Sequence, residues 1–302
     1  FEIGMSKKGE IDNLSKLIKP HIGIITNIGE AHIENFSNIH GIAKAKSEII
    51  NSIEKNGTII LNRDDKFFNF LRKKAKLKKL KIITFGKNKK SDIFPLIFLK
   101  SSYSTRVIFK VKKEKINLEF KNINIYNIMA ALAVIKELNH NPNNIKKILR
   151  NFEPTEGRGK IHIISRYNKK FNLIDESYNA NPTSVKNAIN NLCSIKKEKF
   201  KKYLLLGDML ELGNKSKMYH EKLSKVINNS DIDKVFVKGE KTLFTYKSLN
   251  KNKQGNILQH NDDIDLVLKT IINNNDYLMI KGSNATGLNS LSKKMIKGLN
   301  VI

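Results

Sequence analysis

Alternation of strand and helix patterns along most of the 302 residues constrains the fold more than any other feature. In the first part of the chain, β-rich apolar runs alternate with helical patterns. The apolar runs are residues 22–26, 58–61 and 81–85, and the helical patterns are residues 10–18, 41–53 and 64–75. Strands that are separated by helices form right-handed βαβ units on a parallel sheet. The sequence therefore predicts an α/β fold.

The segment at residues 92–120 interrupts this alternation. Its runs of alternating apolar and polar residues, at 106–111 and 116–120, are typical of antiparallel hairpins. Helical patterns follow at residues 125–138 and 142–149. The stretch from Phe152 to Gly159 combines a proline, two glycines and charge, which favours a hinge and predicts domains at residues 1–156 and 157–302.

A second α/β unit follows this hinge. Its predicted strands are residues 161–165, 172–175, 203–206, 234–237 and 277–280. Its predicted helices are residues 182–194, 218–227, 263–272 and 288–298. Four of the strands run directly into polar or glycine residues, which begin at Asp175, Gly207, Lys238 and Lys281. These ends are expected at one edge of a sheet, where they form a ligand-binding crevice.

The composition carries a formal net charge of +28. Clustered Lys and Arg would indicate nucleic-acid binding, but here the excess is mostly Lys, is spread over the chain and accompanies abundant Ile and Asn, as an A/T-rich genome produces. We therefore expect no specific nucleic-acid partner.

No run approaches the roughly 20 apolar residues that cross a bilayer, and there is no signal-peptide pattern. With Cys193 as the one cysteine, the chain is expected in the cytoplasm, as a monomer.

The most informative motif runs from Asn27 to His32, directly after the apolar run at residues 22–26. Residues 1–5 look like the end of a buried strand whose beginning is missing, so we interpret the chain as a fragment in which Glu2 also follows a strand. A carboxylate and an imidazole at one sheet edge could hold a divalent ion together with a phosphate. The alternative is that His32 is an ordinary structural histidine.

An ordered series of motifs resembles the Mur ligases over nearly the whole chain. In the first domain these are Glu2-Ile-Gly-Met5, Gly9-Glu-Ile, Asn27-Ile-Gly-Glu-Ala-His32, Ala45-Lys46-Ser-Glu48, Asn62-Arg-Asp-Asp65 and Tyr126-Asn127-Ile-Met-Ala-Ala131. Gly157-Arg158-Gly159, Asp175-Glu-Ser-Tyr-Asn179-Ala-Asn181-Pro182, Gly207-Asp208-Met-Leu-Glu211-Leu-Gly213 and Lys281-Gly282-Ser283 continue the series. The resemblance implies a central ATP-binding domain, mostly parallel with a small antiparallel part, and then a Rossmann-like C-terminal α/β domain.

The resemblance also implies an activity, with ATP and Mg²⁺ as cofactors. Members of this family phosphorylate a carboxylate of a nucleotide-linked peptide with ATP, and an incoming amine then attacks the acyl phosphate. The YNANP and GDMLELG strings resemble the member that adds D-alanyl-D-alanine to UDP-N-acetylmuramoyl-tripeptide in peptidoglycan precursor synthesis. The alternatives are another Mur ligase, a folylpolyglutamate synthase relative, or a noncatalytic basic protein that binds nucleotides or nucleic acid.

In the first domain, the resemblance assigns Glu2 and His32 to the magnesium site. It identifies Lys46 as a lysine that is carbamylated on its amine and so becomes an anionic oxygen ligand for a second magnesium. Lys44 leaves a register alternative, although the Ala-Lys-Ser-Glu context favours Lys46. Asn127 resembles the residue that contacts adenine, since an amide can both donate and accept hydrogen bonds.

In the second domain, the resemblance places Arg158 on the ATP phosphates when the domains close, and Asp175 on the ribose. The crevice that receives the dipeptide is expected to be lined by Asn179, Asn181, Asp208, Glu211 and Ser283. For Asn181, which precedes Pro182, a helix N-cap is an equally good account.

A G-x-x-x-x-G-K-[ST] phosphate loop is absent from the sequence. In the family this loop lies upstream of the position of Glu2, with a further domain that grips the uridine nucleotide. We therefore expect that this chain alone cannot complete the reaction.

Overall fold

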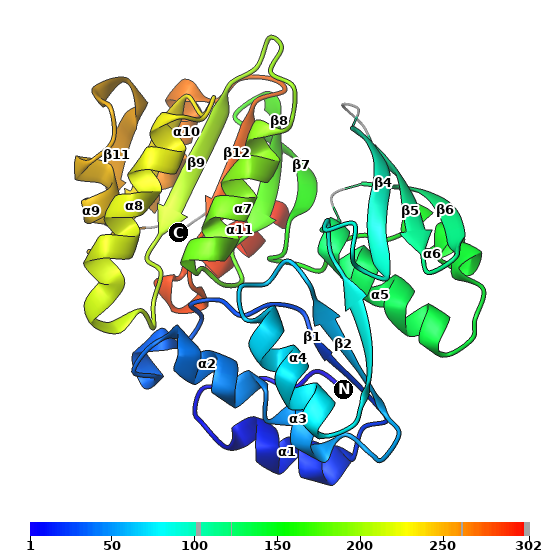
Figure 1. Cartoon of the computed structure of the whole chain (residues 1–302). Helices are drawn as coiled ribbons and strands as arrows, with labels where there is room; N and C mark the ends of the chain where they lie inside the picture. The colour runs from blue at the N-terminus through cyan, green and yellow to red at the C-terminus, as the bar shows by residue number, and fades with distance from the viewer. Residues whose placement is uncertain (101–103, 122, 261, 299–302) are drawn as a thin grey trace. The chain divides into compact units, whose positions relative to one another are not determined.

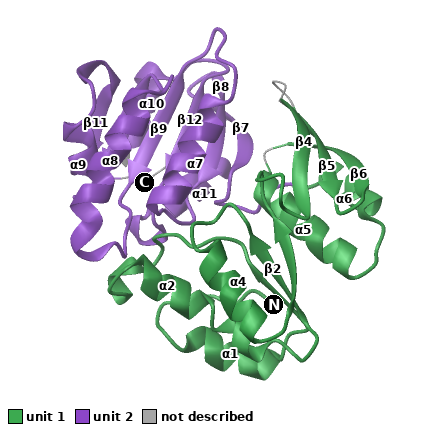
Figure 2. Ribbon diagram, viewed as in Figure 1, with its two compact units in different colours: residues 1–152 green, residues 153–302 purple. Residues whose placement is uncertain are grey.

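The computed structural model describes residues 1–100, 104–121, 123–260 and 262–298. The chain divides into two compact units, unit 1 at Phe1–Phe152 and unit 2 at Glu153–Ile302 (Figures 1 and 2). Each unit is an α/β structure built on its own sheet, as the strand and helix patterns predict. Within the described part of the chain, no helix is both long and apolar enough to cross a membrane.

Unit 1 contains a six-stranded sheet in the order β1-β2-β3-β4-β5-β6. The strands are β1 (Ile22–Ile25), β2 (Thr58–Asn62), β3 (Lys81–Phe85), β4 (Ile93–Lys100), β5 (Thr105–Val111) and β6 (Glu114–Phe120). The pairs from β1 to β4 are parallel, whereas β4, β5 and β6 pair antiparallel, which confirms the hairpins expected in this segment.

Helices cover this sheet because their apolar stripes face it. They are α1 (Glu10–Ile18), α2 (Ile39–Lys46), α3 (Ile49–Ser52), α4 (Phe68–Leu77), α5 (Ile125–Glu137) and α6 (Ile145–Arg150), with short 3₁₀ turns η1 (Ile33–Asn35) and η2 (Pro142–Asn144). Helix α5 packs against β2, β3, β4 and β5, and its Met129 and Leu132 join Phe85 and Phe109 in one buried cluster. Burying such side chains stabilises the unit by roughly 1.5–3 kcal/mol each.

Two expectations for unit 1 were wrong. Residues 1–5 form no strand in the structure, and Phe1 is fully exposed, with only Met5 of this segment buried. The helix expected at residues 41–53 is broken into α2 and α3 at Ser47 and Glu48. The break arises because the Ser47 hydroxyl donates to Lys44 O at 2.6 Å, which competes with the regular helical pattern.

Unit 2 contains a second six-stranded sheet in the order β11-β10-β9-β12-β8-β7. The strands are β7 (Lys160–Arg166), β8 (Lys169–Glu176), β9 (Lys202–Gly207), β10 (Lys234–Lys238), β11 (Gln254–Leu258) and β12 (Tyr277–Lys281). All pairs are parallel except the β7–β8 hairpin, whose turn residues Tyr167 and Asn168 both have positive φ, as a two-residue hairpin loop requires.

The helices of unit 2 complete its α/β layers. They are α7 (Pro182–Cys193), α8 (Ser216–Asn228), α9 (Thr242–Lys247), α10 (Asp262–Ile271) and α11 (Leu288–Ile296), with 3₁₀ turns η3 (Gly213–Lys215), η4 (Lys251–Lys253) and η5 (Asn284–Thr286). The sequence patterns missed β11 and α9. Strand β11 lies at the sheet edge, where polar residues are tolerated, so its sequence QGNIL lacks the apolar run of a central strand.

Parallel pairing brings the carboxyl ends of β8, β12, β9 and β10 to one edge of the unit 2 sheet. In the register of this sheet, Glu176 lies beside Lys281, and Gly207 beside Lys238. The single edge that the sequence predicts for these four strand ends is therefore present.

Candidate functional site

The carboxyl edge of the unit 1 sheet is held together by the side chains of the Asn62-Arg-Asp-Asp65 motif. Asn62 Nδ2 donates to Thr26 O at 3.0 Å, and the Asp65 carboxylate accepts from Ile28 N at 2.7 Å. Because Asn62 ends β2 and Thr26 follows β1, these bonds fix the loop that carries the Asn27-to-His32 motif.

Lys46, the last residue of α2, points its amine at this loop. Its Nζ donates to Asn27 O at 3.0 Å. The pKa of Lys46 is lowered because burial disfavours the charged ammonium, while the nearby Asp65 carboxylate acts in the opposite direction. Lys44 is exposed, so the geometry favours Lys46 over Lys44 as the lysine of the motif.

Glu48, the last residue of the same motif, has a structural role. Its carboxylate accepts from Gly9 N at 3.0 and 3.1 Å and from Asp12 N at 3.2 Å. These donors belong to the N-terminal end of α1, where unpaired N–H groups favour a negative charge. Glu48 therefore ties α1 to the segment that carries Lys46.

His32 and Glu2 occupy different kinds of position. His32 is half-buried and has a left-handed backbone with φ 60°, which turns the chain into η1. Glu2 is exposed in an irregular segment, so its expected placement at the end of a strand is wrong, and its pairing with His32 stays a prediction. In the described residues, no three His, Cys, Asp or Glu side chains gather in a group that could hold a metal ion.

A second polar cluster surrounds Asp64, next to the end of β3. The Asp64 carboxylate accepts from Lys87 N at 2.5 Å, Asn88 N at 3.1 Å and Tyr126 Oη at 3.1 Å. Burial, together with the Asp64 charge, raises the pKa of Tyr126 to about 12, so this phenol remains a donor at neutral pH. Asn127, the next residue, is exposed in the first turn of α5 and is open to a ligand.

In unit 2, Asp175 holds the turn that carries Arg158. Gly157 N donates to the Asp175 carboxylate at 2.7 Å, the Ser177 hydroxyl donates to it at 2.5 Å, and Gly159 N donates to Asp175 O at 2.7 Å. Asp175 is fully buried. In this structure its carboxylate positions the Gly-Arg-Gly turn, and the ribose contact stays a prediction.

Both glycines of the turn are required by geometry. Gly157 and Gly159 have φ of 74° and 97°, and a Cβ on Gly157 would lie 2.7 Å from Cβ of Tyr178. Arg158 between them is exposed and stacks on the Tyr178 ring at 4.8 Å from the centroid. The turn therefore presents one guanidinium on an aromatic surface, a geometry that suits an anionic group.

The loop after β8 combines one exposed and one capping asparagine. Asn179 is exposed, and its Oδ1 accepts from Ala180 N at 2.7 Å. Asn181 forms a capping box at the start of α7, with Ser184 N donating to its Oδ1 at 2.8 Å and its own N–H donating to Ser184 Oγ at 3.0 Å. The N-cap alternative for Asn181 is confirmed.

The crevice residues that follow β9 and β12 include Ser283 and Asp208, whose side chains form hydrogen bonds to neighbouring loops. Ser283 is buried, and its hydroxyl accepts from Leu210 N at 3.0 Å and donates to Ala180 O at 3.3 Å. Asp208 Oδ1 accepts from Thr242 N at 2.8 Å. Glu211 is exposed on a left-handed turn with φ 62°. Of these three residues, Glu211 is the most open to a ligand.

Two buried residues that the sequence analysis did not assign to the site, His220 and Lys281, hold its loops in place. His220 is fully buried, accepts from Met209 N at Nε2 (3.1 Å) and donates from Nδ1 to Ser216 O (2.8 Å), so it is neutral and holds the loop after β9. Burial lowers its pKa. Lys281 is nearly fully buried at the end of β12. Its sequence signals were its place in the Lys-Gly-Ser motif and its position at the end of a predicted strand.

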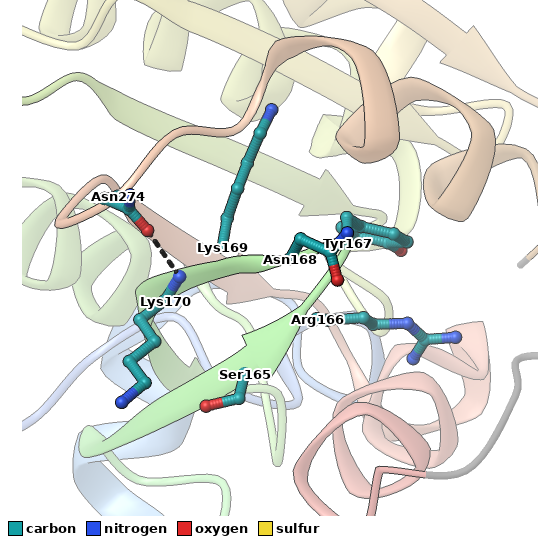
Figure 3. A pocket seen from close by; sticks show the side chains of 7 residues that line it. All are labelled: Ser165, Arg166, Tyr167, Asn168, Lys169, Lys170 and Asn274. Atoms are coloured by element: carbon teal, nitrogen blue, oxygen red, sulfur yellow. Dashed lines mark hydrogen bonds between the residues drawn. The ribbon is translucent and has the colours of Figure 1, made fainter.

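A depression in unit 2 lies at the opposite end of its sheet from these strand ends. This cavity of about 520 Å³ surrounds the β7–β8 turn, and its walls include Arg166, Lys169 and Asn274 (Figure 3). Arg166 is already paired with Asp265 at 2.6 Å, and Lys170 N donates to Asn274 Oδ1 at 2.7 Å. Ligands of parallel sheets bind at the carboxyl ends of the strands, so we assign the candidate site to that edge and not to this cavity.

Comparison with known proteins defines the class. The Mur ligase middle domain matches residues 1–135, and the Mur ligase, glutamate ligase domain matches residues 163–284. Together with the two sheets and their polar carboxyl edges, these matches show that the chain belongs to the Mur ligase family.

Within that family, two similar relatives have the same name. The UDP-N-acetylmuramoyl-tripeptide--D-alanyl-D-alanine ligases of Bacillus subtilis and of Buchnera aphidicola subsp. Acyrthosiphon pisum are each 31% identical over 98% of this chain. The chain spans 64% of the length of each of these two relatives.

Solved structures lead to the same class of fold. MurF from Acinetobacter baumannii superposes with a TM-score of 0.84 at 26% identity, over 97% of this chain and 63% of that one. MurF ligase from Thermotoga maritima, solved in complex with ADP, has a TM-score of 0.84 at 24% identity, over 98% and 66% of the two chains.

Proposed function

We propose that the complete protein containing this chain is an ATP-dependent ligase that joins D-alanyl-D-alanine to UDP-N-acetylmuramoyl-tripeptide. The observation that carries this proposal is the match, over 98% of the chain, to ligases of that name. The domain boundary near residue 156, the cytoplasmic location and the monomeric state remain predictions of the same proposal.

The proposed reaction has two steps. The terminal phosphoryl group of ATP is transferred to the free carboxylate of the tripeptide, which gives an acyl phosphate and ADP. The uncharged amine of the dipeptide then attacks the acyl carbon, phosphate leaves, and an amide bond forms with loss of a proton. Catalysis of this kind depends mainly on positioning and on stabilising negative charge.

In unit 1, Lys46 is the residue proposed to carry the negative charge of a carbamate. Carbamylation requires an uncharged amine, because CO₂ is attacked by the nitrogen lone pair and a proton is lost to solvent. Burial lowers the pKa of Lys46 and so increases the uncharged fraction. The resulting carbamate would be an anionic oxygen ligand at the end of α2, next to the loop that carries His32.

Magnesium stays a prediction, with Glu2, His32 and modified Lys46 on the protein side. Oxygens of the carbamate and of the nucleotide phosphates would supply further ligands, as is usual for Mg²⁺. A requirement for Mg²⁺ in the assay below, with loss of activity on chelation, is the expected result.

The other proposed roles follow the exposed polar groups. Asn127, which is exposed, is proposed to contact adenine, and Arg158, which is stacked on Tyr178, is proposed to contact a phosphate. Asn179 and Glu211 are the exposed candidates for the dipeptide, with Asp208 and Ser283 shaping the same edge. Asn181 and Asp175 act through the loops that they hold.

The direct test is ADP release by the complete natural protein with UDP-N-acetylmuramoyl-tripeptide, with and without D-alanyl-D-alanine. Release that requires the D,D-dipeptide and is not supported by L-alanyl-L-alanine is expected. If ADP release is absent while DNA binding falls steeply with salt, the noncatalytic alternative is correct instead.

A matched pair of variants tests the proposed role of Lys46. Lys46→Ala is expected to lower kcat by at least about 10²-fold, the scale for loss of one transition-state stabilising group. Short-chain carboxylic acids should restore part of that activity. Lys44→Ala, two residues away on the same helix and exposed, serves as the control and should retain activity. Full activity of Lys46→Ala would refute this role.

A further inference from the structure

Lys281 is a buried cation that makes two bonds at the carboxyl edge of unit 2. Its Nζ donates to Glu176 Oε2 at 3.0 Å and to Asn179 O at 2.7 Å. Its side chain is 3% exposed, whereas that of Glu176 is 20% exposed. The two partners bracket the loop at residues 176–179, so one ammonium holds both ends of that loop.

The position of Lys281 in the sheet anchors its two bonds to the loop at residues 176–179. Lys281 ends β12, which lies between β8 and β9, and it is in register with Glu176 of β8 and Leu206 of β9. A charge buried in a central strand requires good partners, because an unpaired buried charge is strongly destabilising. The loop at residues 176–179 is therefore fixed to a central strand of the sheet.

The same loop carries the contacts of the Arg158 turn. Tyr178 N donates to Gly157 O at 3.1 Å, and the Tyr178 ring supports the Arg158 guanidinium. Glu176 Oε1 also lies against Gly159, 3.0 Å from the place that a Cβ would take. Movement of the loop would thus shift Arg158 and Asn179 together.

We propose that Lys281, paired with Glu176, is a positioning residue that sets the relative placement of Arg158 and Asn179 for the anionic and dipeptide groups of the ligand. This inference rests on the proposed function for the identity of the ligand, but not for the coupling between the two loops. Lys281 itself is too deeply buried to contact the ligand.

Unit 2 offers a matched control in Lys202, at the start of β9. Lys202 is fully buried and has the same type of partners, Ile195 O at 2.5 Å and Asp231 Oδ2 at 2.6 Å. These partners lie at the other end of the sheet from the site edge. Lys202→Met therefore removes a comparable buried ammonium without touching the loop at residues 176–179.

The first experiment needs no activity. Backbone amide resonances of this 302-residue chain are compared by NMR in Lys281→Met and Lys202→Met. Lys281→Met should shift the amides of residues 157–159 and 176–181, and Lys202→Met should not, although both lower the urea midpoint. Equal shifts in the two variants, or none in Lys281→Met, would overturn the inference whatever the reaction is.

The second experiment separates positioning from stability in the complete protein. Lys281→Met should lower kcat/KM by about 10-fold or more, since misplacement of a binding group by about 1 Å costs up to 10²-fold. Glu176→Gln is then added, so that the double variant buries no unpaired carboxylate. Its urea midpoint should recover, but kcat/KM should stay low because the bond to Asn179 O is still missing.

Recovery of kcat/KM together with stability would show that Lys281 is only structural and would refute the positioning role. A wild-type protein with no D-alanyl-D-alanine-dependent ADP release would instead refute the proposed function, and the NMR comparison would still decide the coupling of the two loops.

Discussion

The carboxyl edges of the two sheets carry similar residues but use them differently. In unit 1, Lys46 is half-buried and donates to one carbonyl, Asn27 O, and among the described residues no carboxylate lies within ion-pair distance of its amine. In unit 2, Lys281 is nearly fully buried and makes an ion pair with Glu176. The ion pair of Lys281 therefore holds structure, whereas the chemical role of Lys46, which has only the nearby charge of Asp65, stays a prediction.

The same contrast holds for the carboxylates. Asp175 of unit 2 is fully buried and binds Gly157 N and the Ser177 hydroxyl. Glu2 of unit 1, which the resemblance assigns to the metal, is exposed. Asp175 therefore fixes a turn of unit 2, whereas the Glu2 carboxylate of unit 1 is exposed.

The largest effect on stability is expected for Asp175→Ala. Loss of the carboxylate leaves a buried Gly157 N–H and the Ser177 hydroxyl unpaired, which should lower the free energy of unfolding of unit 2 by about 3 kcal/mol. This loss of free energy is measured by chemical denaturation, with amide hydrogen exchange in unit 2 as the readout. Asp263→Ala is the control, because Asp263 makes similar bonds at an exposed site, to Gln259 N and His260 N, and should cost much less. Equal losses would break the contrast.

His220 gives a second test of the structural character of the unit 2 edge. Its pKa is lowered by burial, so the folded state resists protonation while the unfolded state binds a proton near the ordinary pKa of about 6.5. The stability of unit 2 should therefore be complete above about pH 6.5 and fall as the pH drops below it.

His220→Leu removes this titration and should make stability less dependent on pH between pH 7 and 5. It also leaves Met209 N unpaired, which should cost about 2 kcal/mol at pH 7. Urea unfolding at a series of pH values measures both effects. An unchanged pH dependence in the variant would contradict the assignment of a neutral buried histidine.

Glu48 sharpens the comparison within unit 1. Because it caps the N-terminal end of α1 through Gly9 N and Asp12 N, Glu48→Ala should lower the stability of unit 1 by about 1 kcal/mol. Glu34→Ala, on the exposed face of η1, is the control and should change stability by less than about 0.5 kcal/mol. If the two variants behaved alike, the capping role of Glu48 would be wrong.

The smallest effect on stability is expected for Lys46→Met. Methionine fills a similar volume without the desolvation cost of the ammonium, and the one lost bond, to Asn27 O, is worth about 1 kcal/mol. The net change in the stability of unit 1 should therefore stay within about 1 kcal/mol, although activity is lost. A large destabilisation would show that Lys46 is structural, as Lys281 is.

Much of the fold was predictable from local patterns. Helix α1 and strand β3 match the predicted bounds, because each has a clear apolar period and a clear end. The break between α2 and α3 was missed because it depends on the Ser47 side chain and on the long-range bonds of Glu48. Strand β11 was missed because pairing with β10, and not its own composition, makes it a strand.

The candidate site was predictable as a list of positions and not as a set of roles. The motifs placed Asn181 among the dipeptide ligands, with an N-cap as the alternative, and the structure has the cap. They also gave no place to His220, since a lone histidine on a helical pattern has no sequence signal that distinguishes a buried support from a surface residue.

By itself, the sequence determined the α/β class, the parallel strand ends and the family, because apolar periodicity and strings such as YNANP are local. Only the tertiary structure decided which polar groups are open to a ligand and which are consumed by the fold. Lys281 meets Glu176 across 105 residues of chain, and Asp175 meets Gly157 across 18. Burial and hydrogen bonding between such distant residues fix a side chain's charge and availability, and no local pattern contains them.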